Sequence, residues 1–372
     1  MHDAVRILCL STNGIMVDGI TSWMKSTFSA MDFEGLDVTT TAFEGCPSDV
    51  VDSVRRCGIK VVTVPDRKKQ PFKYIGAYRG LLRAGNFDVV HVCCNSAMAV
   101  FEVFEAKRAH IPMRIAHSHN TRCEHPFANS VLNPLFQACI TDRYACGQDA
   151  GKWLFGNRPF TVIPNGKDLS EYGFDLQKRK ILREELGLAE GEVAIGHVGG
   201  FNEQKNHGKL IEVFAELYRR DPSKRLFLVG EGSLMREVKE KAMALGVADV
   251  VRFLGRRTDV PHLLNAMDCM VLPSLYEGFP NVVLEWQLNG LPVVMSDIVT
   301  DECAITSLVS QVSLSAPASE WAEVVEHAMS GRSRADDSAA ARKVAKAAGY
   351  DIRENAMMLR RLYLEVLRDA DK

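Results

Sequence analysis

Residues 272–292 read LPSLYEGFPNVVLEWQLNGLP, and this stretch decides the fold. The four apolar residues 269–272 are typical of a buried parallel strand. Residues 273–280 are rich in proline, serine and glycine, which indicates a turn. The pattern then predicts a helix over 281–289 that ends at a glycine. A strand, a glycine-containing loop and a helix form the repeating unit of an open α/β sheet, which binds ligands at the carboxyl ends of its strands.

The start of this helix is a candidate anion site. The amides of Asn281, Val282 and Val283 are expected to have no partner in the first helical turn, and the helix dipole adds to their attraction for a phosphate. Glu277 lies in the loop before these amides, and Glu285 lies inside the helix. A carboxylate accepts from two neighbouring hydroxyls, so one on each side suggests a diphosphate with sugar rings at both ends. The spacing alone leaves open an ordinary helix with a solvated Glu285 and a plain loop at Glu277.

The residues Glu277-Gly278-Phe279-Pro280, with Glu285 eight positions after Glu277, resemble the signature of the family 4 glycosyltransferases, which are retaining enzymes of the GT-B fold. The resemblance extends over nearly the whole chain and is weakest at its N-terminus. It implies that Glu277 lies against the donor sugar and that Glu285 holds the ribose hydroxyls. It also implies an α/β protein of two Rossmann-like, doubly wound domains that face a cleft.

An alternation of strands and helices agrees with this fold class. The predicted strands are 5–10, 38–43, 60–64, 89–93, 114–117, 193–198, 226–229, 250–254, 269–272 and 293–296. We expect an N-terminal acceptor-side domain over 1–168 and a C-terminal nucleotide-sugar-binding domain over 169–350. Apolar residues recur at helical spacing in 351–369, and the resemblance implies that this terminal helix packs back on the first domain.

Two residues of the first domain are candidates for ligand contact. Gly14 follows the first strand and would let the backbone approach a ligand, although a plain strand-to-helix turn also explains it. His119 follows the strand 114–117 and would project from the carboxyl edge of the sheet toward a cleft. Such a histidine is commonly structural. The resemblance implies instead that His119 lies beside the donor sugar and donates a hydrogen bond to the sugar or its phosphate.

A glycine-rich loop opens the second domain. Gly199 and Gly200 permit close approach of a phosphate, and Lys205 supplies a mobile cation. Family members have arginine where this chain has Gly200, so one of two phosphate cations is missing, which removes about 1.5–3 kcal/mol if nothing replaces it. Arg256 or Arg257 is a candidate replacement. The resemblance also implies that the loop with Arg256 contacts the base.

The predicted site therefore has a catalytic set and a donor-binding set. The catalytic residues are His119, Lys205 and Glu277. The donor-binding residues are Gly14, Gly199, Gly200, Lys205, Arg256, Glu277, Gly278, Phe279, Pro280, Asn281, Val282, Val283 and Glu285. Because no residue pair resembles a nucleophile with its acid-base partner, we expect front-face attack, with the leaving phosphate stabilised by Lys205 and the amides after Pro280 and acting as the base. No acidic cluster has metal-ligand spacing, and neither a catalytic metal nor another cofactor is expected.

The composition excludes several classes of protein. The 372 residues are 47% hydrophobic and 25% charged, as in a globular protein large enough for two domains. A formal net charge of −2 argues against general nucleic-acid binding. The ten cysteines form no CxxC pair, which favours a reducing, cytoplasmic environment. Residues 5–10 are too short for an N-terminal signal, and no apolar run reaches the ~20 residues of a membrane span.

Residues 67–83 form a strongly basic segment without an acidic residue. Its six basic residues are Arg67, Lys68, Lys69, Lys73, Arg79 and Arg83, with the aromatic residues Phe72, Tyr74 and Tyr78 among them. Part of the segment can form an amphipathic helix on an anionic membrane, with about 1 kcal/mol for each basic residue near the surface. A solvated charged face is the alternative. Because relatives act on lipid-linked acceptors, we expect a peripheral position on the inner face of the membrane.

Together these features predict a retaining hexosyltransferase that uses a nucleotide diphosphate sugar, with uridine as the base by resemblance, and a glycan or lipid-linked acceptor. The resemblance is to bacterial enzymes of exopolysaccharide or capsule biosynthesis. Gly200 leaves open a sugar-nucleotide-binding subunit with little activity of its own. An epimerase of the GT-B fold is a third alternative, but it would need acid-base carboxylates beyond those found.

Overall fold

A computed structural model describes residues 4–370, with side chains to residue 366. Its contacts divide the chain into two compact units, a first unit of Met1–Asp168 with Gly349–Lys372 and a second unit of Leu169–Ala348. The second unit thus ends two residues before the predicted boundary at 350. The reason is that the Tyr350 carbonyl accepts from the Lys167 amide, and Asp351 pairs with Lys167 inside the first unit.

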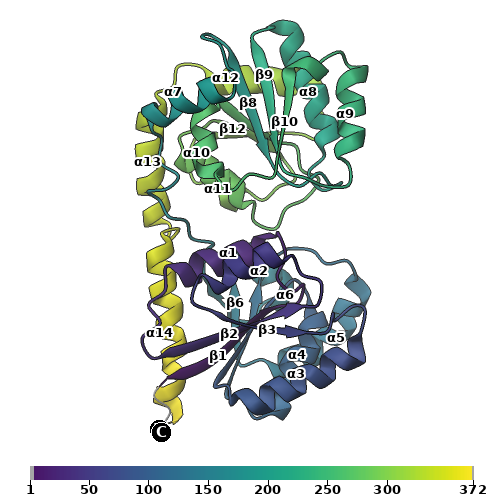
Figure 1. The fold of residues 1–372 in the computed structure, drawn as a ribbon, viewed down its shortest axis with the longest axis vertical. Coiled ribbons are helices and arrows are strands. Elements are labelled where there is room, and N and C mark those ends of the chain that lie inside the picture. Colours follow the sequence, from purple (N-terminus) through teal and green to yellow (C-terminus); the bar gives the residue numbers. More distant parts are fainter. Residues whose placement is uncertain (1–3, 371–372) are drawn as a thin grey trace. The chain divides into compact units, whose positions relative to one another are not determined.

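The first unit is built on a seven-stranded parallel sheet with the strand order β3-β2-β1-β4-β5-β6-β7. Figure 1 labels β1, β2, β3 and β6 of this sheet. The strands are β1 Val5–Ser11, β2 Leu36–Phe43, β3 Lys60–Val64, β4 Val89–Cys94, β5 Met113–Ser118, β6 Asp142–Ala145 and β7 Thr161–Val162. The helices are α1 Gly19–Ser29, α2 Ser48–Arg55, α3 Pro71–Gly85, α4 Val100–Arg108, α5 Pro126–Cys139, α6 Gln148–Phe155 and α14 Ile352–Ala370. The chain order reverses between the neighbouring strands β1 and β4, which is the point where such sheets bind ligands.

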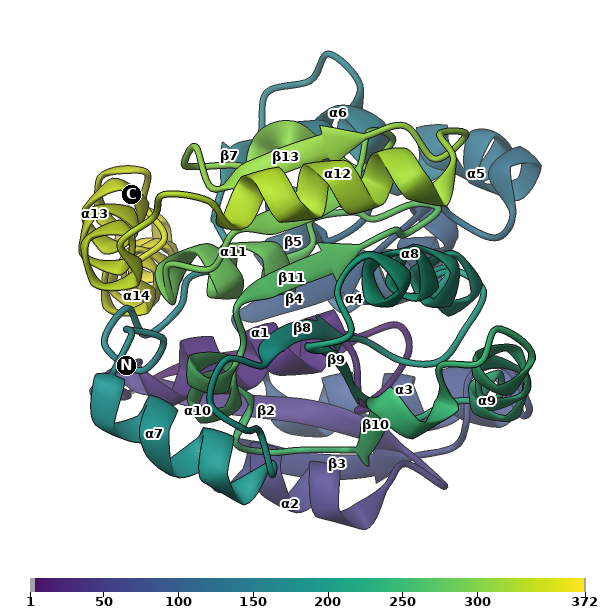
Figure 2. The same ribbon diagram turned by 90° about the horizontal axis from the view of Figure 1, so that it is seen from above.

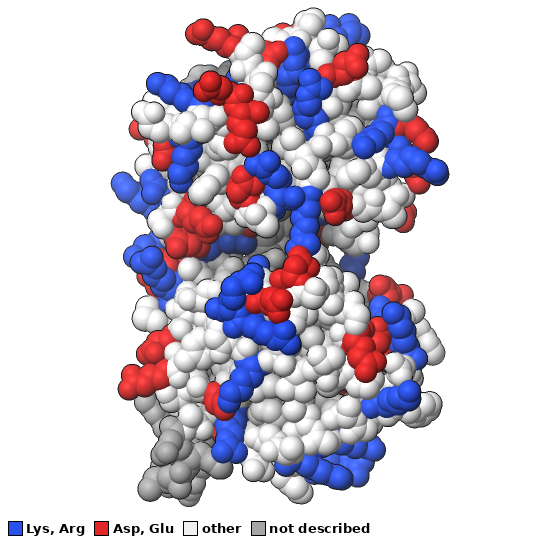
Figure 3. All heavy atoms as spheres, in the orientation of Figure 1, with Lys and Arg blue, Asp and Glu red and all other residues white. Residues whose placement is uncertain are grey.

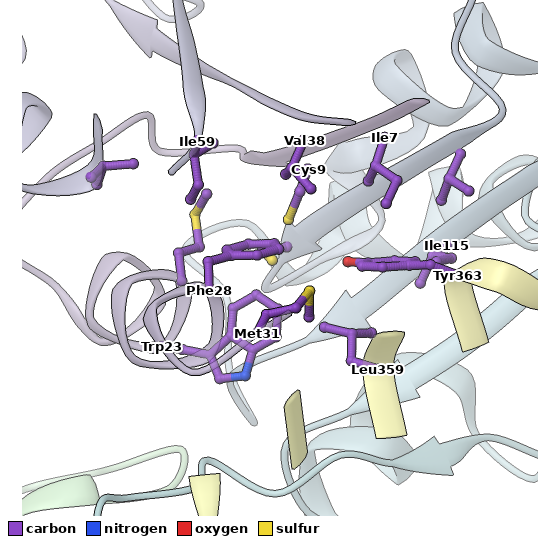
Figure 4. Packing of buried hydrophobic residues seen from close by; sticks show 14 of the residues in the cluster. Ile7, Cys9, Trp23, Phe28, Met31, Val38, Ile59, Ile115, Leu359 and Tyr363 are labelled. Atoms are coloured by element: carbon purple, nitrogen blue, oxygen red, sulfur yellow. The ribbon is translucent and has the colours of Figure 1, made fainter. Parts of the chain in front are cut away.

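Two apolar clusters cover the two faces of this sheet. One cluster takes alternate residues of β1, such as Ile7 and Cys9, and the other takes Leu8 and Leu10. Figure 4 shows the first cluster, in which Trp23 of α1 and Tyr363 of α14 pack against the sheet. The helix α14 thus belongs to the core of the first unit although it is the last element of the chain.

The second unit has a six-stranded parallel sheet with the order β10-β9-β8-β11-β12-β13. The strands are β8 Val193–Val198, β9 Lys224–Val229, β10 Val251–Gly255, β11 Cys269–Leu272, β12 Val293–Ser296 and β13 Val309–Val312. The helices are α7 Leu176–Glu185, α8 His207–Arg220, α9 Met235–Ala244, α10 Val260–Leu263, α11 Asn281–Leu288, α12 Ala318–Met329 and α13 Arg334–Ala347. Figure 2 shows α8 and α12 side by side, and their apolar residues fill one core of the unit. The chain order reverses between β8 and β11.

Each predicted strand is present within two residues of its predicted ends. The sheets also contain β6, β7 and β13, which lie outside the strands predicted. Among the described residues, no helix combines the length and the apolar composition that crossing a membrane would require.

Candidate functional site

The second unit brings two loops together where its strand order reverses. Loop 199–206 follows β8, loop 273–280 follows β11, and these strands are neighbours. The Leu275 amide donates to the Gln204 carbonyl at 2.8 Å, and Asn206 Nδ2 donates to the Pro273 carbonyl at 3.1 Å. Asn206 has a φ of 50°, so its left-handed backbone turns the chain into α8. The two loops are therefore tied to each other at the edge where α/β sheets bind ligands.

Lys205 and Glu277, both predicted to be catalytic, are in direct contact at this edge. Lys205 Nζ lies 2.6 Å from Glu277 Oε1, and Gln204 Nε2 donates to Glu277 Oε2 at 3.0 Å. Gln204 Nε2 also donates to the Tyr276 carbonyl at 3.0 Å. The side chain of Lys205 is 15% exposed and that of Glu277 is 8% exposed. The predicted mobile cation is thus held by the predicted sugar-binding carboxylate, in a pair that is mostly removed from water.

Glycines allow the loops after β8 and β9 to approach closely. A Cβ at Gly230 would lie 2.1 Å from the Gly199 carbonyl oxygen, and a Cβ at Gly232 would lie 2.4 Å from the Phe201 carbonyl oxygen. The Phe201 amide donates to the Glu231 carbonyl at 2.9 Å. Only glycine fits at positions 230 and 232, because the obstacle in each case is backbone.

Gly199 and Gly200 differ in the room around them. A Cβ at Gly199 would lie 2.9 Å from His197 Nε2 and 3.1 Å from Lys205 Cδ. At Gly200 the nearest atom would be the Glu231 carbonyl oxygen at 3.5 Å, an ordinary contact. The structure therefore leaves room for a Cβ at position 200.

The predicted anion site at the start of α11 is present in part. Pro280 is the N-cap residue, and the Val283 amide donates to the Pro280 carbonyl at 2.9 Å. The prediction that Val283 has a free amide was therefore wrong, because the first turn is tight enough for this bond. The amides of Asn281 and Val282 have no partner among the described residues. Two donors, rather than three, remain for an anion.

The residues on either side of these amides are largely buried. Gly278 and Phe279 complete the loop, and Phe279 is buried. Glu285 is also buried on α11. The alternative of an ordinary helix with Glu285 in solvent does not describe this structure, since a carboxylate is rarely buried without a reason.

Arg256 and Arg257 follow β10, and the two arginines differ in their exposure and contacts. Arg256 is exposed. Arg257 forms two bonds to Asp259, at 2.8 and 2.7 Å, and lies 3.5 Å from Glu185. These bonds lower the pKa of Asp259 and raise that of Arg257. The guanidinium of Arg257 is therefore shared between two carboxylates, and its suggested role as a replacement for the missing phosphate cation stays a prediction.

Two histidines beneath the loop were not among the predicted site residues. His197 Nδ1 lies 2.8 Å from the Val271 carbonyl, so Nδ1 holds the proton and Nε2 is an acceptor without a partner. The His207 ring stacks on Phe201 with 4.1 Å between centroids. Burial lowers the pKa of both histidines, that of His207 to about 4. They are therefore neutral, and Lys205 supplies the positive charge of the loop.

In the first unit Gly14 forms a tight turn after β1. Its amide donates to the Ser11 carbonyl at 3.1 Å, its φ is 73°, and a Cβ would lie 2.8 Å from Phe43 Cδ2. The next turn ends at Asp18, which caps α1 by accepting from the Thr21 amide at 2.8 Å. Burial raises the pKa of Asp18. The turn geometry alone accounts for Gly14.

His119 follows β5 at the carboxyl edge of the same sheet. Its ring centroid lies 4.1 Å from that of His117 and 5.1 Å from that of Trp23. Its Nε2 is buried and unpartnered. Burial lowers the pKa of His119 to about 3. If it donates to a ligand, it therefore does so as a neutral imidazole.

Fewer residues of the basic segment 67–83 are available to contact a membrane than its sequence suggests. Arg67 Nε lies 2.9 Å from the buried Glu102 Oε1, and Arg79 forms two 2.7 Å bonds to Glu105, which lower the pKa of that carboxyl. Tyr74 and Tyr78 are buried in the core, on the apolar side of the helix α3. Lys68, Lys69, Phe72, Lys73 and Arg83 are exposed.

Charges of both signs are mixed on the face of the molecule drawn in Figure 3. Figure 3 shows Lys and Arg mixed with Asp and Glu on the visible face of each unit. Such mixing does not favour the phosphate backbone of a nucleic acid. Among the described residues, one group has metal-ligand spacing, His91, Cys93 and His117, whose ligand atoms lie within 4.8 Å of one another. It lies in the core of the first unit.

Known proteins resemble this chain in sequence. Residues 178–346 match the family model described as glycosyl transferases group 1. EpsF of Bacillus subtilis (strain 168), whose name describes a glycosyltransferase, is 30% identical over 366 residues, which cover 94% of each chain. The UDP-Gal:alpha-D-GlcNAc-diphosphoundecaprenol alpha-1,3-galactosyltransferase of Escherichia coli is 26% identical over 306 residues, which cover 78% of this chain and 79% of that one.

A solved structure matches the fold over nearly the whole chain. Anabaena HepE in complex with UDP superposes with a TM-score of 0.80 at 18% identity, covering 97% of this chain and 100% of that one. The same protein in complex with UDP-glucose gives a TM-score of 0.77. These matches confirm the predicted fold class, α/β with two Rossmann-like units of the GT-B type.

Proposed function

The chain belongs to the group 1 glycosyltransferases, the family 4 enzymes predicted from its sequence, and we propose on this basis that it transfers a hexose-type sugar from a UDP-sugar with retention at the anomeric carbon. The observation that supports this most directly is the Lys205–Glu277 pair at the point where β8 and β11 adjoin. It puts a cation for phosphates and a carboxylate for sugar hydroxyls side by side.

In the proposed mechanism the donor diphosphate rests against the amides of Asn281 and Val282. Lys205, which pairs with Glu277 in this structure, then also donates hydrogen bonds to the phosphates. Glu277 accepts hydrogen bonds from the sugar hydroxyls. Glu285, buried on α11, accepts from the ribose. The acceptor hydroxyl attacks from the side of the leaving phosphate, which takes up its proton while the lysine and the amides stabilise the negative charge. The scheme needs no metal, because these groups supply the positive charge.

Several similarities support the choice of donor and acceptor. HepE was solved with UDP and with UDP-glucose, and the E. coli relative bears the name of an enzyme that uses UDP-Gal and a diphosphoundecaprenol-linked sugar. We therefore assign UDP as the nucleotide, a lipid-linked glycan as the acceptor and polysaccharide assembly as the setting. His119 is assigned to the donor sugar as a neutral hydrogen-bond donor.

A lipid-linked acceptor requires the protein to work at a membrane surface, and the first unit has a face suited to this. Phe72 of α3 is 89% exposed and Phe127 of α5 is 83% exposed. The ion pair between Lys68 Nζ and Glu124 Oε2, 3.8 Å apart, shows that the starts of these two helices adjoin. Lys68, Lys69 and Lys73 surround Phe72 in the sequence. Exposed aromatic rings beside lysines fit the headgroup region of an anionic leaflet.

Calorimetry with UDP, followed by transfer assays with UDP-sugars and a polyprenyl-diphosphate-linked acceptor, tests the function. Wild type is expected to bind UDP and to form an α-linked product from an α-linked donor. Glu285→Gln keeps the size of the side chain but removes its charge, and should weaken UDP binding about 10–100-fold through loss of a charge-assisted hydrogen bond. Glu323→Gln, exposed on α12, is the matched control. Equal UDP affinity of Glu285→Gln and wild type would refute the ribose assignment.

The position of Gly200 favours a second candidate, a subunit that binds sugar nucleotides but scarcely transfers them. A Cβ at position 200 would meet only ordinary contacts, so an arginine can be introduced there to test the missing cation. If the chain is an enzyme limited by this cation, Gly200→Arg should raise kcat for UDP-sugar turnover about tenfold, because a charge-assisted bond is worth about 1.5–3 kcal/mol. Gly200→Gln adds a side chain without charge and is the control. UDP-sugar binding without turnover in wild type and in Gly200→Arg would support the binding subunit.

A further inference from the structure

Three side chains of the first unit form a hydrogen-bonded line through its core. Tyr363 of α14 places its hydroxyl 2.6 Å from His91 Nδ1, and His91 Nε2 lies 3.1 Å from His117 Nδ1. The histidines belong to the neighbouring strands β4 and β5, where His91 pairs with Ile115 and Cys93 pairs with His117. All three side chains are fully buried. The line therefore joins the last helix of the chain to the strand that ends beside His119.

Every group in the line is electrically neutral. Burial raises the pKa of the Tyr363 hydroxyl well above its usual value and lowers that of His91 to about 3. Burial also lowers the pKa of His117 well below its usual value. Each imidazole thus has one proton, on one of its two nitrogens.

Neutrality restricts the line to two arrangements of protons. If Tyr363 donates to His91 Nδ1, then His91 Nε2 donates to His117 Nδ1, and the proton of His117 is on Nε2. In the reverse arrangement His117 Nδ1 donates to His91, and His91 donates to the tyrosine oxygen. The direction of the Tyr363 hydroxyl thus determines the tautomer of His117.

The line ends against His119, whose own side chain has no hydrogen bond within the described residues. Its ring is held by contact with two other rings, His117 at 4.1 Å and Trp23 at 5.1 Å between centroids. Trp23 also meets the His117 ring edge-on at 4.9 Å. The Nε2 atoms of both His117 and His119 are buried and unpartnered. The orientation of His119 therefore depends on where its two neighbouring rings are held.

We propose that Tyr363, His91, His117 and Trp23 are positioning residues for His119. The hydrogen-bonded line holds the His117 ring in one plane, and His117 and Trp23 together hold the His119 ring, so that its free nitrogen is presented in one orientation. The proposal rests on the proposed function, in which His119 contacts the donor sugar. It makes α14 part of the machinery that orients this residue rather than a packing element alone.

Other titratable groups face the line from each element packed around it. Cys9 of β1 and Cys93 of β4 lie close to Tyr363, and burial raises the pKa of the Cys93 thiol well above its usual value. Tyr144 of β6 meets the rings of His91 and His117 at 6.0 and 6.2 Å. Asp18 of α1 acts on Cys93 and Glu365 of α14 on Tyr144 through their charges, without a hydrogen bond to the line.

A metal ion held by His91, Cys93 and His117 is the competing explanation of the cluster. It would need a lone pair on both His91 Nε2 and His117 Nδ1, whereas in the 3.1 Å hydrogen bond one of these nitrogens carries the proton that it donates. Metal analysis of the purified protein separates the two. One equivalent of zinc, lost from His91→Gln, would overturn the hydrogen-bonded line.

The test compares Tyr363→Phe with Tyr144→Phe. Both remove one hydroxyl from a buried tyrosine of the same core, but only Tyr363 bonds to the line. In protein with ¹⁵N-labelled histidine, Tyr363→Phe should shift the imidazole resonances of His91, His117 and His119, whereas Tyr144→Phe should leave their tautomers unchanged. This arm needs no substrate, so it decides the positioning even if the transfer assay fails. Unchanged His119 resonances in Tyr363→Phe would overturn the proposal.

The kinetic arm uses the same variants with His119→Ala as the benchmark. Tyr363→Phe should lower kcat about 3–10-fold with KM for the donor within twofold of wild type, and His117→Phe should lower it further because no hydrogen bond holds its ring. UDP affinity should be unchanged in all of them. If His119→Ala has normal kcat, the assignment of His119 to the donor fails; if it is impaired but Tyr363→Phe and His117→Phe are not, the positioning line fails.

Discussion

Lys205 and Glu277 are the residues on which the proposed chemistry depends most. They are 72 positions apart in the chain, yet their charged atoms lie 2.6 Å apart. Because the pair is mostly buried, removing either partner leaves the other charge uncompensated in surroundings of low polarity. A donor diphosphate would give Lys205 a second anion and release Glu277 toward the sugar. Mutation of this pair therefore changes stability and catalysis together, and both must be measured.

Lys205→Ala is expected to lower kcat for sugar transfer about 100-fold or more, because the leaving phosphate loses its cation. It should also lower the free energy of unfolding by about 3–5 kcal/mol, because the mostly buried charge of Glu277 loses its cation. UDP release and urea unfolding, measured on one preparation, check both. Lys209→Ala is the control, since its Nζ donates to the Ala316 carbonyl at 2.6 Å and has no acidic partner among the described residues. Normal turnover in Lys205→Ala would place the phosphate cation elsewhere.

At the scale of residues, sequence reasoning identified side chains but not their contacts. Glu277 and Lys205 stand out because each lies in a glycine-containing loop after a strand. Their ion pair depends on β8 and β11 being neighbours, which no local pattern encodes. The Val283 amide was misjudged because the tightness of a first helical turn depends on backbone geometry. His197 was missed because a histidine inside an apolar strand gives no signal beyond its position.

At the scale of elements, the helix α3 has one side packed in the core and one side exposed to solvent. Tyr74, Tyr78 and Leu82 recur every four residues and are buried in the core. Phe72 and Lys73, on the other side, are exposed. The buried side explains why the aromatic residues of the basic segment are not all available to a membrane. The exposed side, together with Phe127 of α5, is the surface proposed to contact lipid.

Phe72→Ser with Phe127→Ser should reduce binding to anionic vesicles about tenfold or more, because two exposed rings no longer enter the headgroup region. Changing Lys68, Lys69 and Lys73 to Gln should reduce binding further, most strongly at low salt. Co-sedimentation with phosphatidylglycerol vesicles measures both.

The matched control for charge changes Arg55, Arg56 and Lys60, three exposed basic residues of the same unit, to Gln. It has the same net charge as the lysine variant, so equal loss of binding would show a general charge effect and contradict the proposed surface. Full binding by the phenylalanine variant would contradict insertion of the rings.

The strands that were predicted have clear apolar runs, and those that were not lack them. Strands 60–64, 193–198, 269–272 and 293–296 have the predicted ends. By contrast, β6 begins with Asp142 and Arg143, β7 has two residues, and β13 reads VSQV at the edge of its sheet. Short or polar edge strands are held by pairing with a neighbour rather than by their own composition.

At the scale of the molecule, the alternation of strands and helices together with the family resemblance was enough to predict two parallel α/β units. The end of the second unit could not be predicted to the residue, because it depends on hydrogen bonds between segments far apart in the chain, at Lys167 and Tyr350. Both units contain neutral histidines in their interior, and this shared property could not be predicted either.

The histidines whose pKa is lowered by removal of the ring from water are His91, His117 and His119 in the first unit, and His197 and His207 in the second. Burial lowers the pKa of each, to about 3 for His91 and His119 and to about 4 for His207. An unfolded histidine has a pKa of about 6.5. Below that pH these histidines are protonated in the unfolded chain but stay neutral in the folded chain. The free energy of unfolding therefore falls as pH falls. These histidines therefore leave the free energy of unfolding unchanged above about pH 6.5 and lower it progressively as pH falls from 6.5 to the folded pKa of about 3 to 4.

His207→Phe should make this loss smaller. Each buried histidine removes about 2 kcal/mol of unfolding free energy between pH 7 and pH 5, when its folded pKa lies at or below 4. The phenyl ring keeps the stacking on Phe201, and neither nitrogen of His207 has a partner within the described chain, so the change breaks no hydrogen bond. Urea unfolding at pH 7 and pH 5 measures the difference, with His327→Gln, exposed on α12, as the control. A pH dependence in His207→Phe as steep as in wild type and His327→Gln would mean that His207 is protonated in the folded protein, and that the loop with Lys205 has a second positive charge.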